Sequence, residues 1–251
     1  MLLAYLRALL ITDPLIALST IVLSTISLVT SLFDSTGRPQ HRVARVWGRL
    51  LLAIAGVRVR VEGLENISAQ GSYVFVSNHL SFMDTPLAMA HIPVQFRFLA
   101  KKGLYKIPFI GFHLKRAGHI PVYRGDARAS LKTLAESARI VRERGISVLV
   151  FPEGGRSPAQ LREFKEGAAY IAIKAGVPAV PVGIAGTRQV LPMGSIIVRS
   201  GPVVLRIGQP IPTSNLTLRD HKHLTRQLRE RVVALTACPP PVSQRRTPQS
   251  A

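Results

Sequence analysis

The sequence contains almost no cysteine and few acidic residues, and both absences exclude classes of protein. Its single cysteine, Cys238, rules out an intramolecular disulfide and any metal site built from several cysteines. Only 13 Asp and Glu stand against 33 Lys and Arg in 251 residues, so the formal net charge is +20. A chain this basic is drawn to an anionic partner, and nucleic acid, a phospholipid surface and phosphorylated metabolites all qualify.

Charge is also missing from one long segment near the N-terminus. Residues 14–33 are uncharged and long enough to cross the core of a bilayer, although seven of them are Ser or Thr. Only Arg7 precedes this segment, whereas four arginines follow it closely, at Arg38, Arg42, Arg45 and Arg49. We expect a membrane anchor, spanning or re-entrant, that leaves the rest of the chain on the cytoplasmic side of the inner or plasma membrane. The alternatives are a buried hydrophobic helix and a signal peptide, for which a convincing Ala-x-Ala site is lacking.

Residues 40–56 predict a basic amphipathic helix. Its apolar side chains recur at helical spacing, with arginines on the opposite side: Val43, Val46 or Trp47, Leu50 and Ile54. Such a helix suits a layer of lipid headgroups, and a helix docked on a domain would show the same pattern.

Alternating or short apolar segments predict seven strands, at residues 57–62, 73–77, 96–100, 119–123, 147–151, 179–184 and 202–207. Helices are predicted at 130–144, where Leu131, Leu134, Ala138 and Val141 share a face, at about 167–175, and around Leu224 to Leu235. Strands that alternate with helices indicate a single α/β domain, whose central, mostly parallel or mixed sheet is flanked by helices. We therefore divide the chain into membrane-associated helices (1–56), the α/β domain (57–237) and a disordered tail (238–251).

The first candidate site follows the strand that ends in Ser77-Asn78-His79, where Asp84 comes five residues after the histidine. Ligands of open α/β sheets gather beyond the carboxyl ends of strands. A histidine is suited to act as a general base, and a carboxylate on its other ring nitrogen would fix the tautomer. Positions i and i+5 of a helix point about 140° apart, so contact requires His79 in the turn and Asp84 in the first helical turn. The alternative is an ordinary turn in which Ser77, Asn78 or Ser81 caps the helix.

The second candidate site is Phe151-Pro-Glu-Gly-Gly-Arg-Ser157, which also follows an apolar strand. Gly154 and Gly155 permit a ligand to approach the backbone closely. Arg156 can hold a phosphate with two hydrogen bonds, and Glu153 can orient that arginine or accept a substrate hydroxyl. The alternative is a plain surface turn. No serine lies in a G-x-S-x-G elbow, so the base is expected to activate a hydroxyl that the substrate brings.

A basic stretch separates the two sites. No acidic residue occurs between Asp84 and Asp126, whereas seven cations do: Arg97, Lys101, Lys102, Lys106, Lys115, Arg116 and Arg124. Such a run is typical of a solvated surface, but its position beside the candidate base favours a polyanionic ligand at a membrane surface. Nucleic acid is not expected, because no recognition element or plain basic helix is evident.

Four ordered motifs together resemble the glycerolipid acyltransferase family, and within it the 1-acyl-sn-glycerol-3-phosphate (lysophosphatidic acid) acyltransferases. They are the N-H-x-x-x-x-D motif with Asn78, His79 and Asp84, then GHIPVYR (118–124), FPEGGRS (151–157) and VPAVPV (177–182). The likeness covers about residues 40–210. One departure is Gly155, where the family usually has threonine.

The resemblance implies that His79 deprotonates the sn-2 hydroxyl of lysophosphatidic acid while Asp84 orients it. Acyl-CoA or acyl-carrier protein would be the co-substrate, with no cofactor, no metal and no acyl-enzyme. The residues expected to bind the acceptor are Asn78, Arg124, Glu153, Gly154, Gly155, Arg156 and Ser157, together with Lys101, Lys102 and Lys165. An anionic phospholipid membrane is the other expected partner.

Two alternatives stay open. The same chemistry could use another acceptor, such as glycerol 3-phosphate, a different lysophospholipid or a lyso-aminolipid. A catalytically silent lipid-binding protein could also keep the fold, although the intact His79 and Asp84 argue against it.

Overall fold

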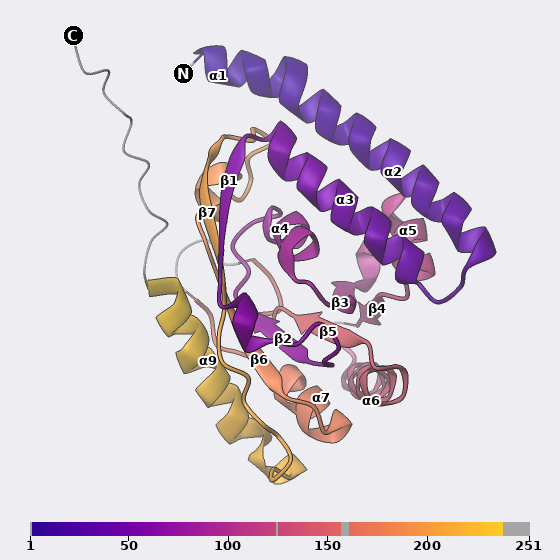
Figure 1. Cartoon of the computed structure of the whole chain (residues 1–251), viewed down its shortest axis with the longest axis vertical. Helices are drawn as coiled ribbons and strands as arrows, with labels where there is room; N and C mark the ends of the chain where they lie inside the picture. The colour runs from indigo at the N-terminus through magenta and orange to yellow at the C-terminus, as the bar shows by residue number, and fades with distance from the viewer. Residues whose placement is uncertain (1, 124, 157–160, 238–251) are drawn as a thin grey trace.

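Seven strands form one mixed sheet within the residues that this computed structural model describes, which are 2–123, 125–156 and 161–237 (Figure 1). Their order across the sheet is β1-β7-β6-β2-β5-β3-β4. Their bounds are β1 Val57–Glu62, β2 Val74–Ser77, β3 Phe96–Lys101, β4 Ile120–Val122, β5 Ser147–Val150, β6 Ala179–Ala185 and β7 Gly201–Ile207. All seven strand predictions are confirmed, each to within one residue at either end. The tail expected at 238–251 lies outside the described residues.

Five neighbouring strands, β6, β2, β5, β3 and β4, run in one direction, because every adjacent pair among them is parallel. β7 is antiparallel to β6, and β1 is parallel to β7. The registers align Val76 of β2 with Val150 of β5 and with Pro181 of β6. The mostly parallel sheet that the sequence predicted is therefore present, and the carboxyl ends of five strands meet at one edge.

Helices cover both faces of this sheet (Figure 1). The described helices are α1 Leu2–Arg7, α2 Asp13–Phe33, α3 Arg38–Ile54, α4 Asp84–His91, α5 Ile110–Arg116, α6 Ala127–Arg144, α7 Gly167–Ala175, α8 Thr187–Val190 and α9 His221–Ala237, with a π-helical turn, η1 Ala8–Thr12, and 3₁₀ turns η2 Leu64–Asn66, η3 Lys102–Lys106 and η4 Leu218–Asp220. Phe75 of β2 packs in a core with α3 and α4, whereas Val74 and Val76 pack with α6, α7 and α9. Strand side chains that alternate in this way bury both faces of the sheet.

α6 differs from its prediction at its start and on its buried face. It begins at Ala127, because the side chain of Asp126 caps it by accepting a backbone N–H. The buried face includes Thr133, Ser137 and Val141, and both hydroxyls donate to backbone carbonyls. Leu131 is 57% exposed, so its predicted place on the buried face is wrong.

The N-terminal helix turns its polar side toward the protein. Tyr5–Phe33 is long and apolar enough to cross a membrane, and its most apolar window has a mean hydropathy of 2.1 and is only 17% buried. Ser19, Ser27 and Ser31 are buried, whereas Leu10 is 67% exposed. The buried hydrophobic helix is therefore the wrong alternative. An apolar face left outside the protein indicates association with a membrane.

α3 is a docked helix that lies between α2 and α4 (Figure 1). Gly48 permits this close approach, because a Cβ atom there would lie 2.5 Å from the carbonyl oxygen of Pro86 in α4. Val46 and Leu50 of the predicted apolar side are 53% and 41% exposed, so the protein covers this side only in part. Leu51 joins the core that the sheet also lines. The domain boundary after residue 56 stays a prediction.

Candidate active site

Two polar loops leave the sheet at neighbouring carboxyl ends. β2 ends at Ser77 and β5 ends at Val150, and these strands are adjacent and parallel. β3, the next strand along, ends at Lys101. The first and third motifs are therefore brought side by side, although His79 and Glu153 are 74 residues apart in the sequence.

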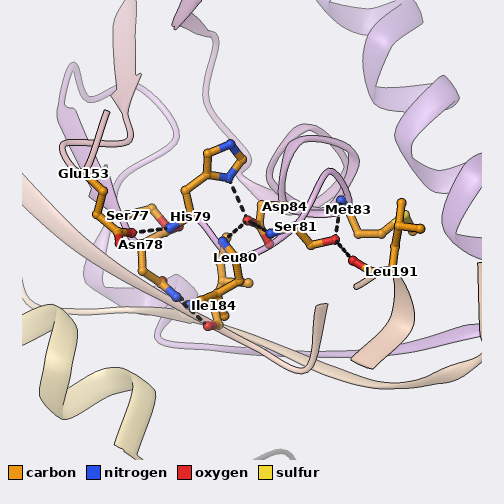
Figure 2. A network of polar contacts seen from close by, with 10 residues as sticks. All are labelled: Ser77, Asn78, His79, Leu80, Ser81, Met83, Asp84, Glu153, Ile184 and Leu191. Carbon is orange, nitrogen blue, oxygen red and sulfur yellow. Dashed lines mark hydrogen bonds and ion pairs between the residues drawn. The ribbon is translucent and has the colours of Figure 1, made fainter. Parts of the chain in front are cut away.

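His79 and Asp84 are in direct contact (Figure 2). The Nδ1 atom of His79, in the turn after β2, lies 2.8 Å from Oδ2 of Asp84, the first residue of α4. The same oxygen accepts the backbone N–H groups of Leu80 and Ser81 at 2.6 and 2.8 Å. Asp84 is fully buried, whereas the His79 side chain is 18% exposed. The turn-and-helix arrangement that contact required is present.

This contact determines which ring nitrogen of His79 can take up a proton. An ionised carboxylate only accepts hydrogen bonds, so Nδ1 carries the hydrogen that points to Asp84. Nε2 then keeps its lone pair, and it lies on the side of the ring away from Asp84 (Figure 2). A histidine held in this way is equipped to accept a proton from a hydroxyl, and the carboxylate stabilises the imidazolium that forms.

The capping alternative is wrong, because α4 has no side-chain cap. Asn78 instead exchanges two hydrogen bonds with the backbone of Ile184 in β6, each 2.8 Å long. The hydroxyl of Ser77 donates to the adjacent Asn78 carbonyl, and that of Ser81 donates to the carbonyl of Leu191. These residues fasten the loop to its neighbours. Asn78 is 1% exposed and both polar atoms of its amide are bonded to the backbone, so a contact with substrate, as the sequence predicted, has no support in this geometry.

Phe151 is a site residue that the sequence analysis missed as such. Its ring stacks on the imidazole of His79, with centroids 4.1 Å apart and an interplanar angle of 15°. It also lies 6.0 Å from the ring of Phe98 in β3. The stack holds the face of the imidazole while Asp84 holds its edge. Its only sequence signal was its place at the start of FPEGGRS, directly after a strand.

Glu153 lies behind the histidine and is 5% exposed. Its Oε1 atom accepts the backbone N–H of His79 at 2.7 Å, and its Oε2 atom accepts that of Arg162 at 3.0 Å. Neither oxygen bonds the guanidinium of Arg156, so the prediction that Glu153 orients this arginine is wrong. The carboxylate instead joins the loop after β5 to the backbone of the candidate base (Figure 2).

Cations gather around the second loop. Gly154 has a φ of +72°, which favours glycine, and a Cβ atom there would lie 3.1 Å from Nζ of the exposed Lys165. The guanidinium of Arg156 lies 3.6 Å from the ring centroid of Phe82, in the loop that carries His79. Gly155 follows in the same loop. Lys165 and Arg156 thus flank this loop, as phosphate binding would require.

Two further candidate cations follow β3. Lys101 is exposed at the strand end, and Nζ of Lys102 lies 4.5 Å from the ring centroid of Tyr123, just after β4. The predicted residues Arg124 and Ser157 lie outside the described residues. β3 lies between β5 and β4, so these lysines lie next to the second loop at the same edge of the sheet.

One cation of the basic stretch is not at the surface. Arg97 is 2% exposed, and its guanidinium donates to Gln95 Oε1 and to the backbone carbonyls of Phe96 and Thr36. Burial lowers the pKa of Arg97 to about 10. The prediction that all seven cations form a ligand-facing surface is therefore wrong for Arg97, which the carbonyl oxygens hold inside the protein.

Three histidines outside the site, of which His41 and His119 are buried and His113 is half-buried, are not equipped to act as bases toward a ligand. Burial and the charge of Arg97 lower the pKa of His41 to about 3 and that of His113 to about 4. Burial also puts the pKa of His119 well below its usual range. Within the described part of the chain, no group of three or more His, Cys, Asp or Glu residues could hold a metal ion.

Comparisons with known proteins agree with this geometry. A family model described as acyltransferase matches residues 58–185, about half of the chain. A chloroplastic 1-acyl-sn-glycerol-3-phosphate acyltransferase of Brassica napus is 36% identical over 191 residues, which are 74% of this chain and 55% of that protein. The 1-acyl-sn-glycerol-3-phosphate acyltransferase of Borreliella burgdorferi is 30% identical over 187 residues, 74% of each chain.

A solved structure is similar over nearly the whole chain. The crystal structure of the 1-acyl-sn-glycerophosphate acyltransferase of Thermotoga maritima superposes with a TM-score of 0.76 at 26% identity, and covers 91% of this chain and 94% of that one. By contrast, the chain spans about half the length of the plant relatives, 55% of the Brassica napus protein and 51% of an Arabidopsis thaliana one.

Proposed function

The chain belongs to the acyltransferase family, and we propose that it transfers a fatty acyl group to the sn-2 hydroxyl of lysophosphatidic acid, giving phosphatidic acid. The donor is acyl-CoA or acyl-carrier protein. The contact between His79 and Asp84, beside a loop flanked by Arg156 and Lys165, carries this proposal. The names of the relatives, which are 1-acyl-sn-glycerol-3-phosphate acyltransferases, support the choice of acceptor.

Nε2 of His79 takes the proton of the acceptor hydroxyl while Asp84 Oδ2 holds the Nδ1–H. The hydroxyl oxygen attacks the carbonyl carbon of the donor thioester and forms a tetrahedral intermediate. This collapses with cleavage of the carbon–sulfur bond, and the departing thiolate takes the proton from the imidazolium. The products are phosphatidic acid and a free thiol, so His79 returns to its starting form. No acyl-enzyme, metal or cofactor takes part in this scheme.

The acceptor phosphate lies over the loop after β5. Gly154 allows close approach of the phosphate to the backbone, and Arg156 and Lys165 supply positive charge from two sides. Lys101 extends the positive field from the end of β3. Asn78, whose polar atoms are already bonded, holds the loop in place and does not touch the phosphate.

The helix Tyr5–Phe33 anchors the enzyme to the membrane that contains its lipid substrate and product. The arginines that follow the helix support a catalytic domain on the cytoplasmic side of the inner or plasma membrane. A membrane-bound site gives an amphiphilic acceptor direct access from the lipid layer.

The proposal is tested by incubating the purified full chain with labelled acyl-CoA, or labelled acyl-carrier protein, and a panel of acceptors. The panel holds lysophosphatidic acid, glycerol 3-phosphate, other lysophospholipids and a lyso-aminolipid. We expect lysophosphatidic acid to give the highest kcat/KM. A higher value for another acceptor would reassign the substrate and leave the reaction class in place, and Gly155, which stands where relatives usually carry threonine, would then be the first residue to change.

Two variants test the residue roles. His79→Ala should remove acyl transfer, because the variant lacks the imidazole that accepts the proton of the acceptor hydroxyl. Unchanged transfer would refute the base assignment. Arg156→Glu should weaken the use of the acceptor far more than the use of acyl-CoA, because the reversed charge repels only the acceptor phosphate. Equal losses for both substrates would show that this arginine is misassigned.

A further inference from the structure

An unusual set of apolar side chains lies in solvent between β3 and β4. Leu104, Ile107, Phe109, Ile110 and Phe112 are 37%, 43%, 48%, 38% and 59% exposed. They belong to η3, the turn after it and α5, and we call them the η3–α5 surface. Single exposed apolar residues are ordinary, but five within residues 104–112 form the kind of patch that marks an interaction site.

The backbone is strained at the centre of this surface. Phe109 has φ 61° and ψ −55°, and it is the one non-glycine residue of the described chain with a positive φ. The N–H of Ile110 donates to the carbonyl of Pro108 at 2.6 Å, which closes a γ-turn around Phe109. Such a conformation is strained for a residue other than glycine and clusters at functional sites. Here it accompanies an aromatic ring that is nearly half exposed.

The charges around the η3–α5 surface fit an anionic bilayer. Lys106, Lys115 and Arg116 are exposed within or beside it, and Lys101 and Lys102 precede it. No acidic residue occurs anywhere from 85 to 125. Aromatic and aliphatic side chains flanked by lysine and arginine are typical of segments that lie in the interface of a membrane with anionic lipids, where each cation is attracted to the headgroups.

The η3–α5 surface lies next to the N-terminal helix. α5 packs against α2, and Ser27 Oγ lies 2.7 Å from Nδ1 of His113 across this contact (Figure 1). A hollow of about 410 Å³ at the junction is lined by Ser31 and Phe112, among others. α2 ends beside it with Phe33, which is 86% exposed. The anchor helix and the η3–α5 surface are therefore adjacent.

From the contact of α5 with the anchor helix, and from the exposed cations around the η3–α5 surface, we infer that this surface enters the interfacial layer of an anionic phospholipid bilayer. It would be a second membrane contact besides helix Tyr5–Phe33. The anchor alone would let the domain turn freely about one helix. A second contact, bonded to the first through Ser27 and His113, fixes the orientation of the domain. It brings the carboxyl end of β3, and with it Lys101, toward the lipid headgroups. The choice of a membrane as the partner of this surface rests on the proposed function, because that function uses a lipid substrate.

Site-directed fluorescence tests the inference on the full chain. In a Cys238→Ser background, Phe112→Cys and Leu131→Cys each receive an environment-sensitive fluorophore, and the protein is reconstituted into vesicles that contain anionic phospholipid. Leu131, on α6 at the other face of the sheet, is the matched control, because it is 57% exposed against 59% for Phe112. We expect a blue shift and quenching by nitroxide lipids at position 112 only. Quenching by aqueous iodide to the same extent at both positions would overturn the inference.

A kinetic measurement separates this inference from the proposed function. Exchanging Phe109 and Phe112 together for serine should raise the KM for acceptor presented in vesicles by roughly tenfold or more, as expected for losing burial of half-exposed aromatic rings. The KM for a dispersed short-chain acceptor should not change, and Leu131→Ser should change neither. Equal effects on both acceptors would contradict a membrane contact. Lipid-quenched fluorescence without acyl transfer would refute the proposed function alone, and transfer with a water-exposed label at position 112 would refute the second contact alone.

Discussion

Glu153 is the residue for which the predicted role and the observed contacts differ most. A conservative change of this residue distinguishes a contact with substrate from a role in positioning His79. Its carboxylate accepts the backbone N–H of His79 through one oxygen and that of Arg162 through the other. Glu153→Gln preserves the shape of the side chain but turns one acceptor oxygen into an NH₂ group. Keeping the remaining oxygen on His79 leaves the NH₂ facing the N–H of Arg162, so one hydrogen bond is lost and the other becomes neutral.

The size of the effect follows from these two bonds. Hydrogen bonds to a charged group contribute about 1.5–3 kcal/mol and neutral ones about 0.5–1.5 kcal/mol. The bond to the His79 backbone therefore weakens by roughly 1–1.5 kcal/mol, which corresponds to about a tenfold loss in kcat if the bond holds the base in its productive position. The KM for the acceptor should stay the same, because Glu153 is 5% exposed and both oxygens are occupied by backbone groups.

Steady-state kinetics with lysophosphatidic acid and acyl-CoA measure both parameters. Glu163→Gln is the matched control, since the Glu163 side chain is 89% exposed and lies 3.5 Å from Arg229 in a surface ion pair. We expect wild-type kinetics for this control. An increase in acceptor KM at unchanged kcat for Glu153→Gln would refute the positioning role and restore the contact with substrate that the sequence predicted.

Three other changes test the site and its surroundings. Asp84→Asn can keep an oxygen on the backbone N–H groups of the turn but removes the charge that faces His79, so kcat should fall by up to about 10⁴-fold, as in serine-protease triads; a loss below tenfold would mean that the carboxylate is not needed for proton transfer. Phe151→Leu should lower kcat and change the acceptor KM less, whereas Phe151→Tyr, which keeps an aromatic ring, should have a kcat close to that of the wild type. Equal kcat values for the two variants would exclude a role for the ring stack. Burial lowers the pKa of His41 to about 3. Below about pH 6.5 the unfolded chain therefore binds more protons at this residue than the folded chain does. As the pH falls toward 3, this difference lowers the free energy of unfolding by about 1.4 kcal/mol per pH unit. Urea unfolding of His41→Gln should therefore show a shallower loss of stability from pH 6.5 to 4 than wild type or the exposed-site variant His223→Gln, and identical slopes would contradict the assignment.

The strands were predictable because each buries one or both faces and therefore shows a local pattern. VRVRVE alternates along an edge strand, whereas SVLV has three consecutive apolar residues and is buried throughout, because β5 is covered on both sides. The helices were predictable in position but less so in their buried faces. Leu131 follows the apolar period of its helix and still lies in solvent, whereas Thr133, two residues later, is buried and donates to the carbonyl of Pro121. Local periodicity carries no information on such close contacts.

For the site, the pair His79–Asp84 was predictable because only four residues separate its members in the sequence. The contacts of His79 with Phe151 and Glu153 depend instead on β2 and β5 being neighbours, and the crossovers through β3 and β4 hide this order in the sequence. Arg97 shows the same limit for charge, since nothing in the basic stretch distinguishes a guanidinium that three oxygens hold inside the protein from one at the surface.

The order of the strands also determines how far each predicted phosphate-binding motif lies from His79. In the spatial order β2-β5-β3-β4, the third motif is one strand away from His79, and the second motif is three strands away. Strands lie about 4.8 Å apart, so the end of β4 is roughly 14 Å from the end of β2, whereas β5 adjoins it. A phosphate close to the hydroxyl that His79 deprotonates is therefore within easy reach of Arg156 and Lys165. Tyr123 directly follows β4, and its ring centroid lies 4.5 Å from Nζ of Lys102, which follows β3. We therefore expect the third motif to supply the primary contact with the proposed phosphate.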